Sequence, residues 1–265
     1  MKDLFINFII YIFSKFNIAI FKNTKKKYLN EFLKKIFIWD CGYKLIRVGQ
    51  RKDGGYVLPD LLNDIRYCFS PGVGNTSSFE DELLNKHNIK CFLADNSVNY
   101  YGVHDFVKKH IGTFNNKTKI TLDSWINKKV NNKKNNKLML QLDVEGYEFE
   151  VINNVSEEIL KRFKIMIIEF HDFNNLRNFF GYKVFSEVFN KILLIHTIVH
   201  AHACNGADYT YINNHKIPKI IEFTFIRNDL IKYKKKIKHN LPHPSLDFKN
   251  LSKKKDIYLP KIFYK

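Results

Sequence analysis

Short apolar runs alternate with helix-like stretches through most of this chain, and this alternation limits the folds open to it. The strand candidates are residues 65–70, 89–95, 119–126, 137–143, 163–171, 197–203 and 219–227. Helical spacing or helix-start signals appear at residues 77–87, 101–110, 148–161 and 174–193. Strands that alternate with helices predict an α/β fold with a mostly parallel sheet. Ligands bind such a sheet outside the carboxyl ends of its strands, so the strand ends should hold the functional residues.

The N-terminal part differs from this pattern. Residues 25–38 have the apolar spacing of a helix, and residues 4–21 are apolar but interrupted by Asn7, Ser14, Lys15 and Asn17. We favour a packing or dimerising helix for residues 4–21; an interfacial membrane helix beside Lys22–Lys27 and a true anchor are the alternatives. We expect an N-terminal helical extension (1–55), a central domain (56–230) and a basic C-terminal tail (231–265) that packs on the domain.

The chain carries 44 Lys and Arg against 26 Asp and Glu, a formal net charge of +18 over 265 residues. This charge suits an anionic partner such as nucleic acid, a membrane surface or a phosphorylated small molecule. Most of it lies in Lys- and Asn-rich runs that read as solvated loops, and no RNA- or DNA-binding motif accompanies them, so nucleic acid is an unlikely partner. The four cysteines form no C-x-x-C pair, which favours a reducing, cytoplasmic setting, with the inner face of the membrane as a variant.

The first strand end is the glycine loop in "CFSPGVGNTSSFE". Gly72 and Gly74 allow a ligand to approach the backbone, and Ser77 with Glu80 predicts a helix capping box. Asp95, 23 residues beyond Gly72, would accept the ribose hydroxyls of an adenosine. A third glycine is absent, which weakens NAD or FAD and favours S-adenosylmethionine, an adenosine cofactor without a pyrophosphate. The candidate cofactor-binding residues are Ser70, Gly72, Gly74, Asn75, Glu80, Asp95 and Asn96.

Carboxylates and histidines follow three further strands. Asp143 ends the strand in "KLMLQLDVEGYEFEVI", with Glu145 next to it, whereas Glu148 and Glu150 read as helix residues with structural or surface roles. Glu169 and His171 project to one side at the end of "IMIIEFH" and could hold a metal or take a proton. His200 and His202 share a face in "HAH" and suggest further lining of a polar cavity. The candidate catalytic residues are therefore Asp143, Glu145, Glu169 and His171.

These motifs together resemble a known family. "TLDSWI", then "LMLQLDVEGYEFEVI", then "IMIIEFH" are very similar to the FkbM-type class I S-adenosylmethionine-dependent methyltransferases, over about residues 65–171 and more weakly to 227. The resemblance implies a Rossmann-like, doubly wound sheet of seven strands, with the cofactor across the first two strand ends. The family's glycine loop usually begins with an acid, whereas Ser70 and Pro71 precede Gly72 here, and Glu80 is a candidate substitute.

The resemblance, in a subgroup associated with sugar and polysaccharide methylation, leads to a hypothesis about the reaction. We expect O-methylation of a sugar hydroxyl, on a nucleotide-activated sugar in capsular or surface polysaccharide biosynthesis, with Arg47, Lys52 and Arg66 as candidate contacts to a diphosphate. His171 could act as a metal-free base, or Asp143, Glu169 and His171 could bind a divalent ion, Mg or Mn. A basic RNA-binding or RNA-modifying protein is the main alternative, and an inactive membrane scaffold is a third.

Overall fold

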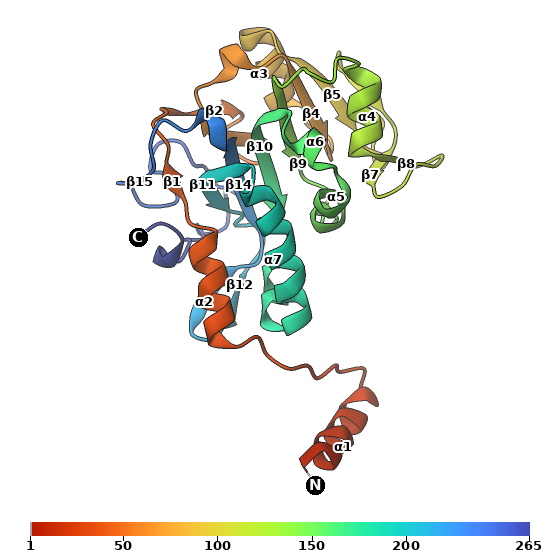
Figure 1. The fold of residues 1–265 in the computed structure, drawn as a ribbon, viewed down its shortest axis with the longest axis vertical. Helices are drawn as coiled ribbons and strands as arrows, with labels where there is room; N and C mark the ends of the chain where they lie inside the picture. Colours follow the sequence, from red (N-terminus) through yellow and green to blue (C-terminus); the bar gives the residue numbers. More distant parts are fainter. Residues whose placement is uncertain (1) are drawn as a thin grey trace.

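A central sheet of seven strands organises the computed structural model, which describes residues 2–265 (Figure 1). Its strand order is β11 (His196–Ala203), β14 (Ile221–Arg227), β10 (Phe163–Phe170), β9 (Leu138–Leu142), β4 (Tyr67–Pro71), β5 (Lys90–Ala94) and β6 (Asp105–Val107). The strands from β10 to β6 pair in parallel, and β14 is antiparallel to both of its neighbours. Numbered along the chain, the order is 3-2-1-4-5-7-6, the Rossmann order with an antiparallel strand inserted. The predicted seven-stranded α/β sheet is confirmed.

Helices cover both faces of this sheet because successive side chains of each strand point to opposite faces. On one face, Leu140 of β9 and Ile168 of β10 share a core with α4 (Leu122–Lys129), α5 (Glu148–Asn154), α7 (Phe179–Leu193) and α2 (Lys26–Lys35). On the other face, Met139 and Ile167 pack with α3 (Ser78–His87) and with the hairpin of β2 (Leu45–Gly49) and β3 (Gly55–Pro59). The sheet is therefore doubly wound, as predicted.

Short elements complete the domain. Two-stranded pairs are formed by β7 (His110–Gly112) with β8 (Lys119–Thr121), and by β12 (Tyr209–Ile212) with β13 (His215–Pro218). Near the ends of the chain, β1 (Trp39–Asp40) pairs with β15 (Lys235–Lys236). The remaining helical segments are α6 (Glu157–Leu160) and the 3-10 turns η1 (Leu62–Asp64), η2 (Phe173–Arg177), η3 (Asn228–Leu230) and η4 (Lys261–Phe263).

Two predicted elements are wrong. The helix expected at residues 101–110 is absent: β6 and the start of β7 occupy this segment, where β6 pairs with β5. The strand expected at residues 119–126 lasts only for β8, because the Thr121 hydroxyl accepts a hydrogen bond from the Ser124 amide and starts α4. Similarly, the helix expected at 148–161 is divided into α5 and α6, with Ser156 capping the second.

The expected domain units lie within this architecture as follows. The boundary between residues 55 and 56 falls inside the structure at the first residues of β3, which pairs with β2 across it. The C-terminal tail contributes β15, and its Phe263 is fully buried in the core shared with α2. The hairpin thus belongs with the central sheet, and the tail packs on the domain.

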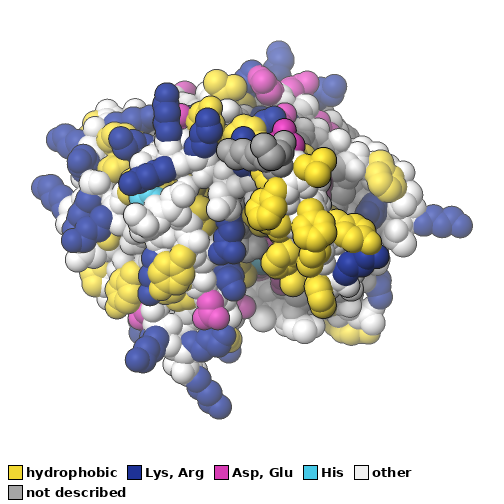
Figure 2. Space-filling model, turned by 90° about the horizontal axis from the view of Figure 1, so that it is seen from below, with side chains coloured by type: hydrophobic (Ala, Val, Ile, Leu, Met, Phe, Trp, Pro, Cys, Tyr) yellow, Lys and Arg dark blue, Asp and Glu magenta, His cyan; other side chains and the backbone are white. Residues whose placement is uncertain are grey.

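Helix α1 (Lys2–Ser14) stands apart from the rest of the molecule (Figure 1). Its hydrophobic side chains are exposed, and Figure 2, viewed from the end where α1 lies, shows them gathered at the surface. Residues 15–22 are exposed as well, and the chain joins the body where Asn23 bridges Asn178. Among residues 2–265, no helix has the length and apolarity needed to cross a membrane.

Phe189 lies at the centre of the aromatic core between α7 and the sheet. Its ring centroid is 4.8 Å from that of Phe170 and 5.5 Å from those of Phe32 and Phe223. We predict that Phe189→Ala lowers the free energy of unfolding by about 3–5 kcal/mol, because the lost contacts leave a cavity. Urea denaturation followed by circular dichroism measures this. Phe180→Ala, on the same helix but 77% exposed, is the control, and equal effects of the two changes would contradict the prediction.

Candidate active site

The glycine loop after β4 lies directly against the end of β9. Gly72 has a φ of +84°, and a Cβ added to it would lie 1.5 Å from the backbone oxygen of Asp143. Its amide donates to the Ala94 carbonyl of β5 at 2.9 Å. Only glycine fits this position, because both the conformation and the space exclude a side chain. The loop therefore brings backbone amides to the carboxyl edge shared by three strands.

Asp95 follows β5 and supports this loop from the other side. Its Oδ2 accepts a hydrogen bond from the Gly74 amide at 3.0 Å, and its Oδ1 accepts from the amide and the hydroxyl of Ser97 at 2.7 and 2.6 Å. The residue is 7% exposed. The carboxylate thus has a fixed orientation beside the loop, as a ribose-binding acid requires.

A cavity of about 750 Å³ opens beside Gly72 and Asp95 at the carboxyl edge of the sheet. This volume suits a ligand of nucleoside size or somewhat larger. Of the predicted cofactor-binding residues, Gly72, Gly74 and Asp95 line it, whereas Ser70, Asn75, Glu80 and Asn96 do not. The lining residues are Gly72, Gly74, Ala94, Asp95, Ser97, residues 110–113, Lys119, Asp143, Val144, Glu145, Tyr147, Glu150 and Val151.

One wall of the cavity was missed by the sequence interpretation. His110, Thr113 and Lys119 come from β7, β8 and the turn between them, in a region expected to be helix and then strand. Glu150, expected to have a structural or surface role, also lines the cavity. Ser97 could have been predicted from the sequence as a partner of Asp95, because it lies two residues after an acid that follows a strand, where Asx-type turns are common.

Glu80 lies beneath the glycine loop and not in the cavity. The predicted capping box is wrong: Ser77 makes no side-chain cap, and its hydroxyl instead contacts Asp81. The Glu80 carboxyl is hydrogen-bonded to the Ser70 hydroxyl. Ser70 also contacts Oε1 of Gln141 at 2.6 Å, and Gln141 donates to the Tyr56 hydroxyl at 3.0 Å.

The proton count in this chain of hydrogen bonds depends on which way the Gln141 amide faces. A hydroxyl has one proton, so Ser70 can donate to Gln141 or to Glu80 but not to both. When Ser70 donates to Gln141, the carboxyl of Glu80 must supply the proton between Glu80 and Ser70. Burial raises the pKa of Glu80 to about 7, although the bond from Ser70 opposes the rise, so about half of the Glu80 carboxyl groups carry a proton at neutral pH.

His171 lies where β10 ends, among several carboxylates. Its Nδ1 is 3.1 Å from Oε1 of Glu148, and its Nε2 is 3.5 Å from Oε2 of Glu145 and 3.7 Å from Oε1 of Glu169. Burial lowers the pKa of His171, but the hydrogen bond and charge of Glu148, with Asp143 and Glu145, raise it above its usual value. The imidazole is therefore oriented by Glu148 and turns Nε2 toward the other acids.

Glu148 is the residue that the sequence interpretation most underestimated. Its side chain is fully buried, and Oε1 also accepts hydrogen bonds from the amides of Val144 and Gly146, each at 3.1 Å. The carboxylate thus holds both the turn after β9 and the imidazole after β10. Its position in the first turn of α5, two residues after a glycine, could have predicted that its carboxylate accepts hydrogen bonds from the preceding turn.

Asp143 lines the cavity and lies close to His171. Burial raises its pKa to about 7, His171 opposes this, and Glu145 and Glu148 add to it. Asp143, Glu145 and His171 each offer an atom within 4.8 Å of the others, so they form a possible set of metal ligands. The set expected from the sequence contained Glu169 in place of Glu145. Glu169 is buried on the sheet face, and burial, Asp143 and Glu222 raise its pKa well above the usual value.

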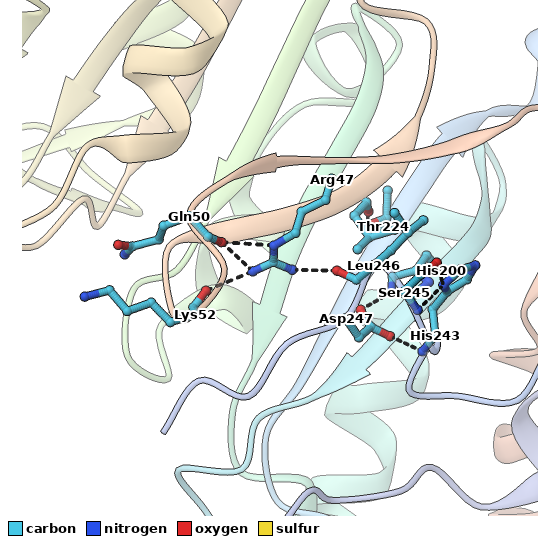
Figure 3. Close-up of polar contacts among 10 residues, drawn as sticks. Arg47, Gln50, Lys52, His200, Thr224, His243, Ser245, Leu246 and Asp247 are labelled. Atoms are coloured by element: carbon cyan, nitrogen blue, oxygen red, sulfur yellow. Dashed lines mark hydrogen bonds and ion pairs between the residues drawn. The ribbon is translucent and has the colours of Figure 1, made fainter. Parts of the chain in front are cut away.

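His200 and His202 do not line the cavity. Nε2 of His200 pairs with Asp247 of the C-terminal tail at 2.9 Å, and both side chains are 1% exposed (Figure 3). His202 lies opposite Glu222, which itself lies opposite Glu169 in the register of the sheet. His202 is therefore in the same row as Glu169, two strands away, whereas His200 anchors the tail.

The expected diphosphate contacts are dispersed. The Arg47 guanidinium donates to the backbone carbonyls of Gln50, Lys52 and Leu246 and so fixes the loop after β2 to the tail (Figure 3). Lys52 is exposed on that loop. Arg66 precedes β4 and lies at the amino edge of the sheet, at the opposite edge from the cavity.

Comparison with known proteins gives this geometry a family. Residues 39–229, most of the chain, match the model of the methyltransferase FkbM domain. The chain belongs to the FkbM methyltransferase family. It is thus an S-adenosylmethionine-dependent methyltransferase, as the resemblance implied.

Other comparisons add little. No curated protein matches the chain. Among solved structures, a precorrin-6y C5,15-methyltransferase from Geobacter metallireducens GS-15 is similar, with 11% identity and a TM-score of 0.30 over 78% of this chain and 94% of that one. This likeness is too remote to argue from.

The cavity of this FkbM methyltransferase fits the cofactor that the family uses. Gly72 and Gly74 leave room for a ligand against the backbone, and the Asp95 carboxylate lies beside them at the position for a ribose. Gly74 has no atom within 4 Å of an added Cβ, so its side faces open space. The assignment of individual residues to parts of the cofactor stays a prediction.

We predict that Gly72→Ala abolishes S-adenosylmethionine binding, because the new methyl group must displace the Asp143 carbonyl and reshape the loop. Isothermal titration calorimetry should show a loss of affinity of at least about 100-fold. Gly206→Ala, outside the cavity and not at a positive φ, is the control and should leave the affinity unchanged. Comparable affinities of the two variants would contradict the close approach at Gly72.

The buried Glu80 predicts a pH dependence of stability. Its folded pKa of about 7 exceeds the usual value of 4.5. The contribution of Glu80 to the free energy of unfolding is therefore fully present below pH 4.5 and is lost as the pH rises through 7. Glu80→Gln keeps a donor to Ser70 and should remove this loss. Its free energy of unfolding should exceed that of the wild type by about 3 kcal/mol at pH 8. Urea denaturation at pH 5 and pH 8 measures the difference; an equal difference at both values would contradict protonation of Glu80.

Proposed function

We propose that this enzyme O-methylates a hydroxyl of a sugar, carried on a nucleotide, in the assembly of a capsular or other surface polysaccharide. The observation that carries the proposal is the oriented His171 beside Asp143, at the strand edge that the cofactor cavity shares. A sugar hydroxyl has a high pKa and needs a base before it can attack a methyl group. The similarity of "DGGYVLPD" and the glycine loop to a sugar-methylating subgroup supports the choice of acceptor.

The residues of the chain would divide the work as follows. Gly72, Gly74, Asp95 and Ser97 hold S-adenosylmethionine, which supplies an electrophilic methyl group. Nε2 of His171 takes the hydroxyl proton as the oxygen–carbon bond forms and the carbon–sulfur bond breaks in line. Glu148 then stabilises the imidazolium through Nδ1. The products are the methyl ether and S-adenosylhomocysteine, and the alignment of the two reactants supplies much of the rate.

The polar rim of the cavity supports a polyhydroxylated acceptor. Glu145 is 88% exposed, and Glu150 and Lys119 also line the opening. Carboxylates accept hydrogen bonds from vicinal hydroxyls, and a lysine suits a phosphate. Lys52, exposed on the loop that Arg47 fixes, is the second proposed contact to the diphosphate.

A divalent ion, Mg or Mn, is the competing way to activate the hydroxyl. Asp143, Glu145 and His171 would hold it: Oδ1 of Asp143 is buried without a partner, and the contact of Glu148 with Nδ1 of His171 leaves Nε2 available as a ligand. An ion there would act as a Lewis acid and lower the pKa of the hydroxyl. The metal-free base is proposed because it requires only groups of the chain itself, and a chelator separates the two mechanisms.

We predict that the enzyme transfers a methyl group to a nucleotide-sugar when a panel of these compounds is offered with S-adenosylmethionine, giving a product 14 mass units heavier by mass spectrometry. His171→Ala should reduce kcat by about 100-fold or more, whereas His215→Ala, on the distant β13, should leave it unchanged. Activity on RNA but on no sugar would overturn the proposal. Loss of activity in a chelator, restored by Mg or Mn, would overturn the metal-free mechanism.

A further inference from the structure

Helix α1 has a wide apolar face and a narrow polar stripe. Asp3, Asn7 and Ser14 are four and seven residues apart and so lie along one line of the helix. Large apolar side chains occupy most of the remaining surface, including Leu4 at 81% exposed and Phe5 at 66%. The exposed apolar residues of α1 are Leu4, Phe5, Ile6, Phe8, Ile10, Tyr11, Ile12 and Phe13. Figure 2 shows this apolar cluster at the end of the molecule.

The body of the molecule does not cover this face. Among the described residues, no hydrogen bond joins residues 3–22 to the rest of the chain; the first links are from Asn23 and Thr24, which meet Asn178 and Arg177. An isolated helix of 13 residues is marginally stable in water. An apolar surrounding that α1 does not find in its own domain would stabilise it.

The length and shape of α1 do not suit a second copy of the chain. A coiled-coil seam uses a narrow apolar stripe repeated over three or more heptads, whereas α1 has fewer than two heptads and an apolar face of more than half its circumference. At 1.5 Å per residue the helix is about 20 Å long, too short to cross a hydrocarbon core of about 30 Å. A helix that is apolar over most of its circumference needs an apolar surrounding on those sides, which the acyl chains beneath the headgroups of a membrane supply.

The segment that follows α1 supplies the matching charge. Residues 15–27 contain five lysines and no acid. Lys15, Lys22 and the three consecutive lysines from Lys25 to Lys27 are all exposed. A cluster of lysines beside an interfacial helix attracts anionic headgroups, at about 1 kcal/mol per lysine near the surface. The apolar helix and the basic segment therefore point to the same partner.

We propose that α1 lies in the interface of an anionic lipid bilayer, with its apolar face among the acyl chains and the lysines of residues 15–27 on the headgroup phosphates. Asp3, Asn7 and Ser14 face the water. The attachment at Asn23 and Thr24 then keeps the methyltransferase domain beside the membrane. This association is independent of the reaction that the domain catalyses.

Flotation of the full chain with vesicles tests the proposal. We expect the wild type to float with vesicles of phosphatidylcholine and phosphatidylglycerol, and much less with phosphatidylcholine alone. Phe8→Asp with Ile12→Asp should lower the affinity by on the order of 100-fold, since both charges enter the apolar face. Asn7→Asp with Ser14→Asp adds the same charge on the polar stripe and should lower the affinity for vesicles by less than about 10-fold.

A third variant separates the electrostatic contribution. Replacement of Lys25, Lys26 and Lys27 by Gln should lower the affinity for anionic vesicles by on the order of 100-fold, or about fivefold per lysine. Unchanged S-adenosylmethionine binding by all variants shows that they are folded. Equal binding of the two double variants, or no vesicle binding by the wild type, would overturn the proposal. A dimer in solution that Phe8→Asp with Ile12→Asp dissociates, without vesicle binding, would assign the face to a second copy.

Discussion

The geometry of the candidate site depends on the buried carboxylate of Glu148. It accepts hydrogen bonds from the amides of Val144 and Gly146 and orients His171, so one side chain fixes parts of two adjacent strand ends. All three contacts fall on Oε1, which joins the turn after β9 to the imidazole after β10. The turn can therefore hold Glu145 at a φ of +54°, an uncommon conformation for a residue with a side chain. Glu148 thus fixes the orientation of His171 close to Asp143.

Other acids on the same face of the sheet are buried with weaker basic contacts; Oε1 of Glu169, for example, lies 3.7 Å from Nε2 of His171. Glu169 and Glu222 are opposite each other in the register, and burial is the main cause that raises the pKa of each well above its usual value. Neutral carboxyl groups can be buried at less cost than charged ones. Glu169 and Glu222 therefore add less negative charge around His171 than ionised carboxylates would. A proton received by Nε2 enters surroundings that already favour an imidazolium.

The sequence predicts the part of this architecture that depends on local periodicity. Buried strands such as residues 138–142 read as continuous apolar runs, and their ends reveal Asp143, Asp95 and the glycine loop. Residues 101–113 have no such pattern, because β6 and β7 are three residues long and owe their conformation to neighbouring strands. The wall of the cavity that these residues form could therefore not be predicted from the sequence. The capping-box motif at Ser77 failed for a related reason, since Glu80 turns inward to a partner on β4.

The two histidine motifs show why a strand-end pattern cannot by itself identify a site. "EFH" at the end of β10 and "HAH" at the end of β11 both place polar side chains on one face of a strand. β10 has its carboxyl end beside β9 and the glycine loop, so His171 meets the acids of the cavity. β11 is an edge strand covered by the C-terminal tail, and His200 is paired with Asp247, 47 residues later in the chain. Alternation predicts the face that a side chain occupies, but the element that covers the face decides whether it meets a ligand or a structural partner.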